Sequence, residues 1–429
     1  MAVFRRFRDG DEVGIVSVIR RCFSGYDRWS LTVKDWLYYE EVDDDFRRDL
    51  AYVAEEDGRV VSHIHVVLRK LVFGRAVVTT GGVANVSTDP EFRGRGLASG
   101  LLKFVINDLR RSGLPLTSLF AGYAARPYRI YRRAGYTPMF FMRTYSGTDE
   151  EARAFIKSVR AGGVDVRPAG REDIDALARL YDEWASTYLS PVKRSRGYWE
   201  RKILSDKPFY HTFYYDYSKA FKVLVAEVGG EPAGYSIGAV ASKFRRRWLP
   251  QDVGHVLEVV GTDSVVVNAL LKEVLKELIS SGAKSIYIHA PTDRRYLGVS
   301  KFFEVFKGGV YMALITDLYR LFKGFEEELS RRVEESGIDF STSIGIKTPT
   351  GSLSIRVSGP EVSVEELRGG EDNTVILGSD EVVKLLHGTA FSKLLIDGLS
   401  QASLTRGGLK ALKALFPGGL SYISPIDHW

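Results

Sequence analysis

Residues 93–98 read Arg-Gly-Arg-Gly-Leu-Ala, and this stretch decides how the chain is interpreted. Before it, Val83 to Thr88 has the composition of a buried strand, and Asp89-Pro90 turns the chain. After it, apolar residues recur at helical spacing as far as Gly113. The glycines are therefore expected at the point where a strand gives way to the N-terminus of a helix.

Such a junction suits an anion. The first backbone N–H groups of a helix have no partner within the helix, and the helix dipole adds positive charge there. Glycines let the main chain approach an anion closely. Arg93 and Arg95 add two cations beside these groups. The stretch therefore predicts a site for a diphosphate.

Two common nucleotide loops do not fit this stretch. The dinucleotide fingerprint needs Gly-x-Gly-x-x-Gly, with an acidic residue about 20 positions further on. Gly94, Gly96 and Gly100 are spaced one residue too widely for it, and Asp108 falls within the predicted helix. The Gly-Lys-Ser/Thr sequence of a triphosphate loop does not occur in the chain.

The pattern Arg-x-x-Gly-x-Ala resembles the motif that holds the pyrophosphate of coenzyme A in the GCN5-related N-acetyltransferase (GNAT) superfamily. Residues 130–136, Ile-Tyr-Arg-Arg-Ala-Gly-Tyr, resemble the Tyr-x-x-x-Gly-Phe/Tyr segment of the same superfamily. The resemblance implies acetyl-CoA as acyl donor, with no metal, and a strand that pairs with the pantetheine arm. The residues that it assigns to cofactor binding are Val86, Ser87, Thr88, Arg93, Gly94, Arg95, Gly96, Leu97 and Ala98.

The chain then repeats its opening pattern. The segment Val164–Pro168, with a helical pattern after it, echoes the start of the chain. Where the second copy should have its phosphate loop, residues 260–264 read Val-Gly-Thr-Asp-Ser, and Asp263 would repel a diphosphate. Residues 149–309 are therefore interpreted as a degenerate copy. Beyond them, the chain predicts a small α+β domain with a long helix over 316–336.

This layout resembles the enhanced-intracellular-survival (Eis) family of GNAT enzymes, in the loop, in residues 130–136 and in the tail that ends Asp-His-Trp. The resemblance implies tandem GNAT-fold domains with mixed sheets, an α/β class, followed by a sterol-carrier-like α+β domain. The predicted domains are a catalytic one over 1–148, a degenerate one over 149–309, and a C-terminal one over 310–429 that ends in the catalytic C-terminus.

Acetyl transfer requires a proton donor for the leaving thiolate. A phenol with a pKa of about 10 stays protonated at pH 7 and can donate to a thiolate with a pKa of about 8.5. The resemblance assigns this role to Tyr131, and the alternative is a tyrosine that is simply packed in its helix. Tyr128 and Tyr136 lie on other faces and are weaker candidates.

The reaction also requires a base, because an amine with a pKa of about 10.4 is protonated at pH 7. The resemblance implies the C-terminal carboxylate, here on Trp429, where relatives commonly end in Phe. Chain ends usually fray, but the apolar residues before this one predict a packed tail. His428, or His63 and His65 on one strand face, remain alternatives. Asn85 stands where some relatives carry an acidic base, which favours the tail.

Composition limits the class of protein. The 429 residues are 45% hydrophobic and 27% charged, as in soluble globular proteins. The single cysteine, Cys22, is expected in a helix core and fits a cytoplasmic location. No apolar run approaches the roughly 18 residues of a membrane span. The net charge of +6 is dispersed and not interleaved with aromatic residues, so nucleic acid is not expected as a partner.

The acceptor is expected to be a primary amine, on a small polyamine-like molecule or a protein lysine, since relatives act on such groups. Some relatives form trimers or hexamers, which makes a homo-oligomer an open alternative. The competing function is a non-enzymatic, CoA-responsive or lipid-binding protein that uses the sterol-carrier-like end. One group of aromatic and acidic residues allows two hypotheses: it lines an acceptor cleft, or it forms a solvated acidic loop, which is the stronger hypothesis. The group consists of Trp29, Trp36, Tyr38, Tyr39, Glu40, Glu41 and Asp43 to Asp45.

Overall fold

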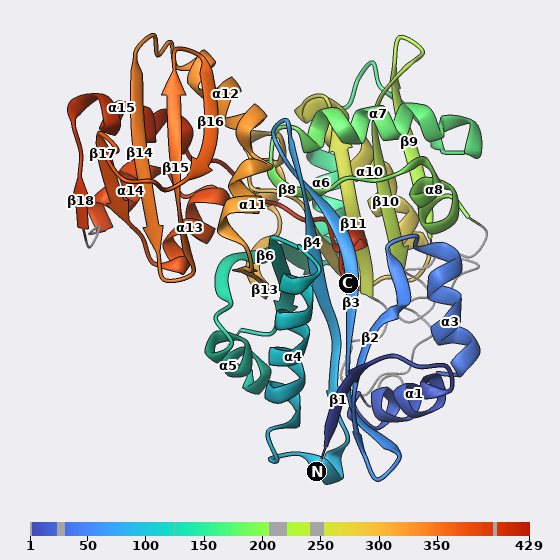
Figure 1. Ribbon diagram of the computed structural model, residues 1–429. Helices are drawn as coiled ribbons and strands as arrows, with labels where there is room; N and C mark the ends of the chain where they lie inside the picture. Colours follow the sequence, from blue (N-terminus) through green and yellow to red (C-terminus); the bar gives the residue numbers. More distant parts are fainter. Residues whose placement is uncertain (1, 24–30, 124, 206–220, 241–252, 398–400) are drawn as a thin grey trace.

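A computed structural model describes residues 2–23, 31–123, 125–205, 221–240, 253–397 and 401–429. Its main feature is a 13-stranded mixed sheet within these ranges. A separate five-stranded sheet is formed by strands within residues 341–403 (Figure 1). Helices cover both faces of the large sheet. The predicted α/β class with mixed sheets is confirmed.

The first GNAT-like unit follows the expected order of elements. Helices α1 and α3 pack on one face of its strands and α4 on the other, so the sheet separates two hydrophobic cores. Its elements are β1 (Val3–Arg6), α1 (Asp11–Cys22), α3 (Val33–Val42), β2 (Phe46–Glu56), β3 (Arg59–Phe73), β4 (Ala76–Thr88), α4 (Leu97–Arg111), β5 (Leu116–Ala121), α5 (Arg126–Arg133) and β6 (Thr137–Thr148).

The second unit repeats this arrangement, which confirms the tandem fold. Its elements are α6 (Asp149–Ser158), β7 (Asp165–Pro168), α7 (Ile174–Ala185), β8 (Leu189–Val192), α8 (Arg196–Tyr198), β9 (Lys222–Val228), β10 (Glu231–Val240), β11 (Val253–Gly261), α10 (Ser264–Ser280), β12 (Ser285–Ile288) and β13 (Glu304–Ile315).

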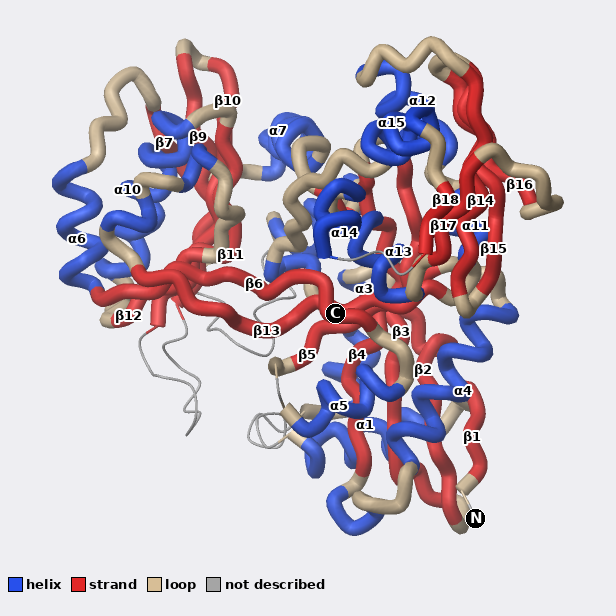
Figure 2. Tube along the Cα trace, turned by 90° about the vertical axis from the view of Figure 1, so that its left-hand side faces the viewer, coloured by secondary structure: helices blue, strands red, loops and turns tan. Residues whose placement is uncertain are grey.

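The two units exchange their last strands. The strand order is β1-β2-β3-β4-β5-β13-β6-β12-β11-β10-β9-β7, so β13 completes the first unit and β6 the second. Residues 310–315 of β13 pair with β5 on one edge, and residues 304–307 and 310–313 pair with β6 on the other. Figure 2 shows β6 and β13 running side by side between the units. Because β13 covers the edge of β5, the first unit is not left with an open edge there.

The third unit is an α+β layer around the five-stranded sheet. Its elements are α11 (Leu318–Lys323), α12 (Glu326–Glu335), β14 (Ser341–Thr348), β15 (Gly351–Ser358), β16 (Glu361–Glu366), β17 (Asn373–Ile376), α13 (Ser379–Leu386), α14 (Phe391–Asp397), β18 (Gln401–Ser403) and α15 (Arg406–Leu415).

The single helix predicted over residues 316–336 is wrong. The chain breaks it at Gly324 and Phe325, which separate α11 from α12. Phe325 is fully buried, with its ring 5.1 Å from that of Phe73 in β3. The break therefore turns an aromatic side chain inward and joins the core of the third unit to that of the first.

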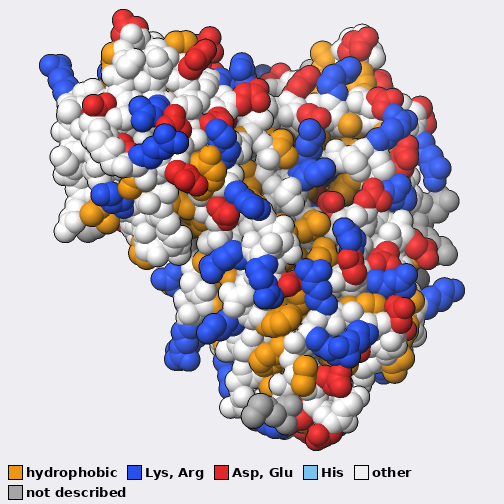
Figure 3. Space-filling view, viewed as in Figure 1, with side chains coloured by type: hydrophobic (Ala, Val, Ile, Leu, Met, Phe, Trp, Pro, Cys, Tyr) orange, Lys and Arg blue, Asp and Glu red, His pale blue; other side chains and the backbone are white. Residues whose placement is uncertain are grey.

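The surface carries mixed charge on the face drawn in Figure 3, where Lys and Arg side chains are interspersed with Asp and Glu. Among the described residues, no helix is long and apolar enough to cross a membrane.

Candidate active site

Strands β4 and β5 part in the middle of the first unit. They pair in parallel only where Thr80 to Val83 lies beside Leu116 to Leu119, and β4 then continues to Thr88 paired with β3 alone. On its other edge β4 carries a bulge at Asn85, whose φ of 49° is left-handed. Bulges bend a strand and increase its twist. The bulge therefore accompanies a gap between β4 and β5, and it leaves one backbone edge of β4 unpaired with β5.

Val86, Ser87 and Thr88, the predicted pantetheine strand, lie in this unpaired stretch. Ser62 of β3 fixes them from the far side, because its Oγ donates to the Ser87 carbonyl at 2.7 Å and lies 2.9 Å from the Thr88 Oγ1. The edge that faces the gap can therefore pair with an extended ligand.

The glycine loop has the conformation that an anion cradle requires. Gly94 and Gly96 have φ of 82° and 78°, and a Cβ at either position would meet no atom within 4 Å. Gly96 is the N-cap of α4 and offers no side chain to that helix end. Within the described ranges, the N–H groups from Gly94 to Ala98 donate to no protein acceptor. These free donors fit a diphosphate.

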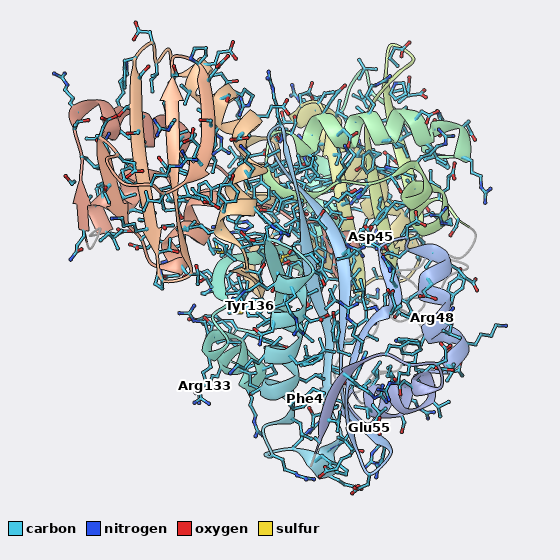
Figure 4. All side chains as sticks on the ribbon, viewed as in Figure 1. Phe4, Asp45, Arg48, Glu55, Arg133 and Tyr136 are labelled. Carbon is cyan, nitrogen blue, oxygen red and sulfur yellow. The ribbon has the colours of Figure 1, made fainter. Side chains whose placement is uncertain are left out.

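Among the loop side chains, Arg93 and Arg95 are exposed cations, whereas Leu97 is buried. Arg93 donates from Nε to the Thr88 carbonyl at 3.3 Å, and Arg95 donates to Glu56 at 2.6 Å. Leu97 is 7% exposed and packs in a small apolar cluster, so only its backbone is available to a ligand. At the same end of the sheet, where Figure 4 labels Phe4 and Glu55, the Phe4 ring abuts Gly100 of α4.

Tyr131 is buried on the α4 side of the sheet. Its side chain is 6% exposed, and burial, with a smaller effect of nearby Cys22, raises its pKa to about 12. Tyr136 differs, because its hydroxyl is hydrogen-bonded to Thr117 Oγ1. Cys22 is half-buried rather than a core residue, with its Sγ 3.5 Å from Arg93. Helix α1, the loop and α5 therefore meet near Tyr131.

The C-terminal residue lies against β4 where β4 and β5 begin to part. A Cβ on Gly82 would come within 2.7 Å of the Trp429 indole, and Gly82 pairs with Ser118 of β5. The indole is also 4.8 Å from the Phe120 ring, centroid to centroid. The six residues from Tyr422 to Asp427 are buried, so the tail is packed as its apolar composition predicts.

Tyr131 and Trp429 approach this region from opposite faces. A Cβ on Gly81 would meet Leu109 of α4, in the core that contains Tyr131, whereas one on Gly82 would meet Trp429. Since neighbouring residues of a strand point to opposite faces, the sheet separates the two predicted catalytic groups.

Among the alternative histidine bases, His63 and His65 are fully buried and His428 is half-buried. Burial lowers the pKa of His63 to about 4 and that of His428 to about 3, and it lowers the pKa of His65 well below its ordinary value. His65 also stacks on Phe46 at 3.9 Å. All three are therefore neutral at pH 7 and are weak bases, which favours the carboxylate.

The structure divides the aromatic and acidic group: Glu41 and Asp44 are exposed, as expected of a solvated loop, whereas Trp36 and Asp43 fit neither hypothesis. Trp36 is 1% exposed and belongs to the core, and Tyr38 and Tyr39 are half-buried. Asp43 is buried and paired with Arg69 at 2.7 Å and Lys202 at 2.8 Å, so it is neither solvated nor free to attract a ligand. Trp29 lies outside the described residues.

The equivalent helix end in the second unit is capped by its own side chain. Asp263 accepts hydrogen bonds from the N–H groups of Val265 and Val266 at 2.8 and 3.0 Å. This carboxylate occupies the donors that α4 leaves free. The second copy is therefore degenerate at the position of the phosphate loop.

The splayed strands and the glycine loop before α4 define a GNAT fold. In agreement, residues 3–139 match the family described as acetyltransferase (GNAT) domain. The match covers the first of the two GNAT-like units.

The chain is also similar to particular proteins. It is 30% identical over 210 residues to an uncharacterised N-acetyltransferase of Streptomyces coelicolor, a match that spans 47% of the chain and 46% of that relative. A GCN5-related N-acetyltransferase from Anabaena variabilis has the same fold over all of both chains, with a TM-score of 0.71 and 14% identity. One from Kribbella flavida gives 0.69 and 17%, over all of this chain and 98% of that one. Eis1 of Mycobacterium abscessus gives 0.61 and 16% over all of both chains.

We expect the Gly96→Ala substitution to weaken binding of coenzyme A about tenfold, or about 1.4 kcal/mol. The new Cβ strains a left-handed residue and stands where the phosphates approach. Calorimetric titration with coenzyme A measures the effect. The matched control is Gly58→Ala, at the turn between β2 and β3, where φ is 73° and the Cβ also meets no atom within 4 Å. Equal affinities in the two variants would contradict the assignment of the glycine loop as the diphosphate site.

Proposed function

We propose that this chain is an Eis-like, acetyl-CoA-dependent N-acetyltransferase that acetylates a primary amine by direct attack, with Tyr131 as general acid and the Trp429 carboxylate as general base. The observation that carries the proposal is the C-terminal residue packed on Gly82, beside the gap between β4 and β5.

The loop and the free edge of β4 support the choice of acyl donor. The unpaired N–H groups from Gly94 to Ala98 suit the pyrophosphate, and Arg93 and Arg95 add positive charge beside it. The edge formed by residues 86–88 would pair with the amides of the pantetheine arm. A backbone N–H of this edge can also polarise a thioester carbonyl. These residues would place the reacting carbon in the gap.

Tyr131 suits the role of acid because it remains neutral. Its pKa of about 12 keeps the phenol protonated throughout the physiological range. The burial that penalises its phenolate would also penalise a thiolate that leaves in the same region. Desolvation raises the pKa of both groups, and the proton can pass from one to the other.

The Trp429 carboxylate suits the role of base because the tail that carries it is packed against the sheet. Deprotonating a free amine at pH 7 costs on the order of 4–5 kcal/mol. A positioned base recovers part of this, typically about 10²–10⁴ in rate. The buried tail supplies the positioning. The acceptor face is the α1 and α3 side of the sheet, where the indole lies.

The acceptor class remains a primary amine, on a polyamine-like molecule or a protein lysine, and assembly into a homo-oligomer remains part of the proposal. The sterol-carrier-like character of the third unit and the domain limits 1–148, 149–309 and 310–429 also remain proposals. Strand β13 crosses position 310, so the last limit falls within a strand.

A short tag on the C-terminus should lower kcat by about 10²–10⁴, because it converts the terminal carboxylate into an amide that cannot accept the proton. KM for acetyl-CoA should change little, since the loop is untouched. Steady-state assays with a panel of primary amines measure both constants. The same tag on the N-terminus is the control, and equal kcat in the two proteins would contradict the assignment of the base.

The Tyr131→Phe variant should lose about 10²-fold or more in kcat. A general acid acts in its protonated form, and a pKa of about 12 keeps Tyr131 in that form at every lower pH. The kcat–pH profiles of the two enzymes should therefore have the same shape between about pH 6 and pH 10, although an ordinary tyrosine begins to titrate near pH 10.

The matched control is Tyr136→Phe, which removes a buried hydroxyl bonded to Thr117 and should lower stability while leaving kcat near that of the wild type. Unchanged kcat in Tyr131→Phe would favour the alternative of a non-enzymatic or lipid-binding protein.

A further inference from the structure

We propose that Asp427 is a positioning residue for the reaction: Arg194 and Glu258 of the second unit hold it, and through it they fix the C-terminal carboxylate two residues further on. This inference rests on the proposed function, in which that carboxylate is the base.

Arg194 forms paired hydrogen bonds with the carboxylates of Glu258 and Asp427. Its Nη1 and Nη2 donate to the two oxygens of Glu258 at 2.8 and 2.7 Å, and its Nε and Nη2 donate to the two oxygens of Asp427 at 2.9 and 2.8 Å. The three side chains are at most 1% exposed. Such two-point pairs fix direction as well as distance.

Three tyrosines complete the site around this ion cluster. Tyr198 donates to Asp427 Oδ1 at 2.6 Å, whereas the Tyr181 hydroxyl donates to the Val192 carbonyl at 2.6 Å and lies 3.4 Å from the other Asp427 oxygen. Tyr235 donates to Glu258 at 2.7 Å, and the Arg194 guanidinium lies 3.9 Å from the centre of the Tyr181 ring. Asp427 thus accepts three short hydrogen bonds, two on Oδ1 and one on Oδ2, and any displacement of the tail breaks several at once.

A second ion cluster, with residues of both units, lies beside this one. Asp43 and Arg69 of the first unit form it with Lys202 of the second, and Asp45 is 3.3 Å from Arg69. The Lys202 Nζ lies 4.4 Å from the centre of the Tyr198 ring. The tail is therefore held by charged groups of both GNAT-like units.

A gain in stability alone does not explain why these charged groups are buried. Removing ions from water is costly, and well-packed apolar residues are often at least as stabilising as a buried ion pair. What buried, fully bonded charges do supply is a single defined arrangement. Asp427 stands where such an arrangement matters, because only one residue separates it from the chain end.

The connection from Asp427 to the terminal carboxylate is short and restrained. His428 donates from its N–H to Pro425 at 3.3 Å, and its ring stacks on Phe120 at 4.0 Å. Two residues of extended chain span at most about 7 Å. With Asp427 held, the carboxylate of Trp429 has little freedom. Asp427 itself is fully buried, so it acts through Trp429 and not on a substrate.

The test is Asp427→Asn, made both in the enzyme with its native C-terminus and in the enzyme with a C-terminal tag. The amide keeps the shape of the side chain but removes the charge and places an NH2 donor against groups that are themselves donors. In the native background we expect kcat to fall by about 10- to 100-fold, since a shift of about 1 Å in a catalytic group can cost as much, with KM for acetyl-CoA unchanged. In the tagged background the same substitution should cause no further loss, because residues that act as one unit are not additive.

The matched control is Glu328→Gln, which removes another buried carboxylate, 1% exposed and paired with Arg331 and Arg332 in α12. It should lower the melting temperature without changing kcat. Should Asp427→Asn fail to fold, Tyr198→Phe removes one hydroxyl, which lies 2.6 Å from Asp427 Oδ1 and 3.0 Å from the Ile426 carbonyl, and it should lower kcat several-fold in the native background alone.

The outcomes separate the two proposals. Equal losses of kcat in both backgrounds, or a lower melting temperature with full kcat, would overturn the positioning role while leaving the base in place. A C-terminal tag that leaves kcat unchanged would overturn the assignment of the base, and the positioning role with it.

Discussion

The contact on which the structure depends is that of the Trp429 indole with the bare backbone of Gly82. Any side chain at position 82 would overlap the indole, since even a Cβ would stand 2.7 Å from its ring atoms. The contact lies where β4 leaves β5. Further along β4 come the bulge at Asn85, the free edge of residues 86–88 and then the glycine loop. One strand thus connects the predicted sites of phosphate, thioester and base.

Each of the three units contributes residues to the proposed site around this contact. The first unit supplies the loop and Tyr131, and the third leads into the tail. The second unit has lost its own anion site, because Asp263 caps α10, yet it contributes Arg194 and Glu258 to the ion cluster that holds the tail. The exchange of β6 and β13 joins the two GNAT-like units into one sheet. In the proposed mechanism, the degenerate copy positions a catalytic group for its neighbour.

Local patterns in the sequence predict the parts of this arrangement that depend on neighbouring residues. Glycines before an amphipathic helix indicate the loop, and an apolar run before the last residue indicates a packed tail. Pairings between distant strands leave no local pattern, so the exchange of β13 could not be predicted. The helix predicted over 316–336 is wrong because periodicity alone does not show that Phe325 turns inward. Burial of charge is also hard to predict, although Glu258 inside the apolar run Val256–Val260 is one signal of it.

The most direct test of this account compares two neighbouring glycines of β4. In Gly82→Ala the new methyl group displaces the indole and the carboxylate attached to it, and kcat should fall by on the order of 10²-fold. In Gly81→Ala the methyl group meets Leu109 on the opposite face at 2.8 Å, so stability should fall while kcat is retained. A Gly82→Ala enzyme with the kcat of the wild type, or equal losses of kcat in both variants, would contradict the account.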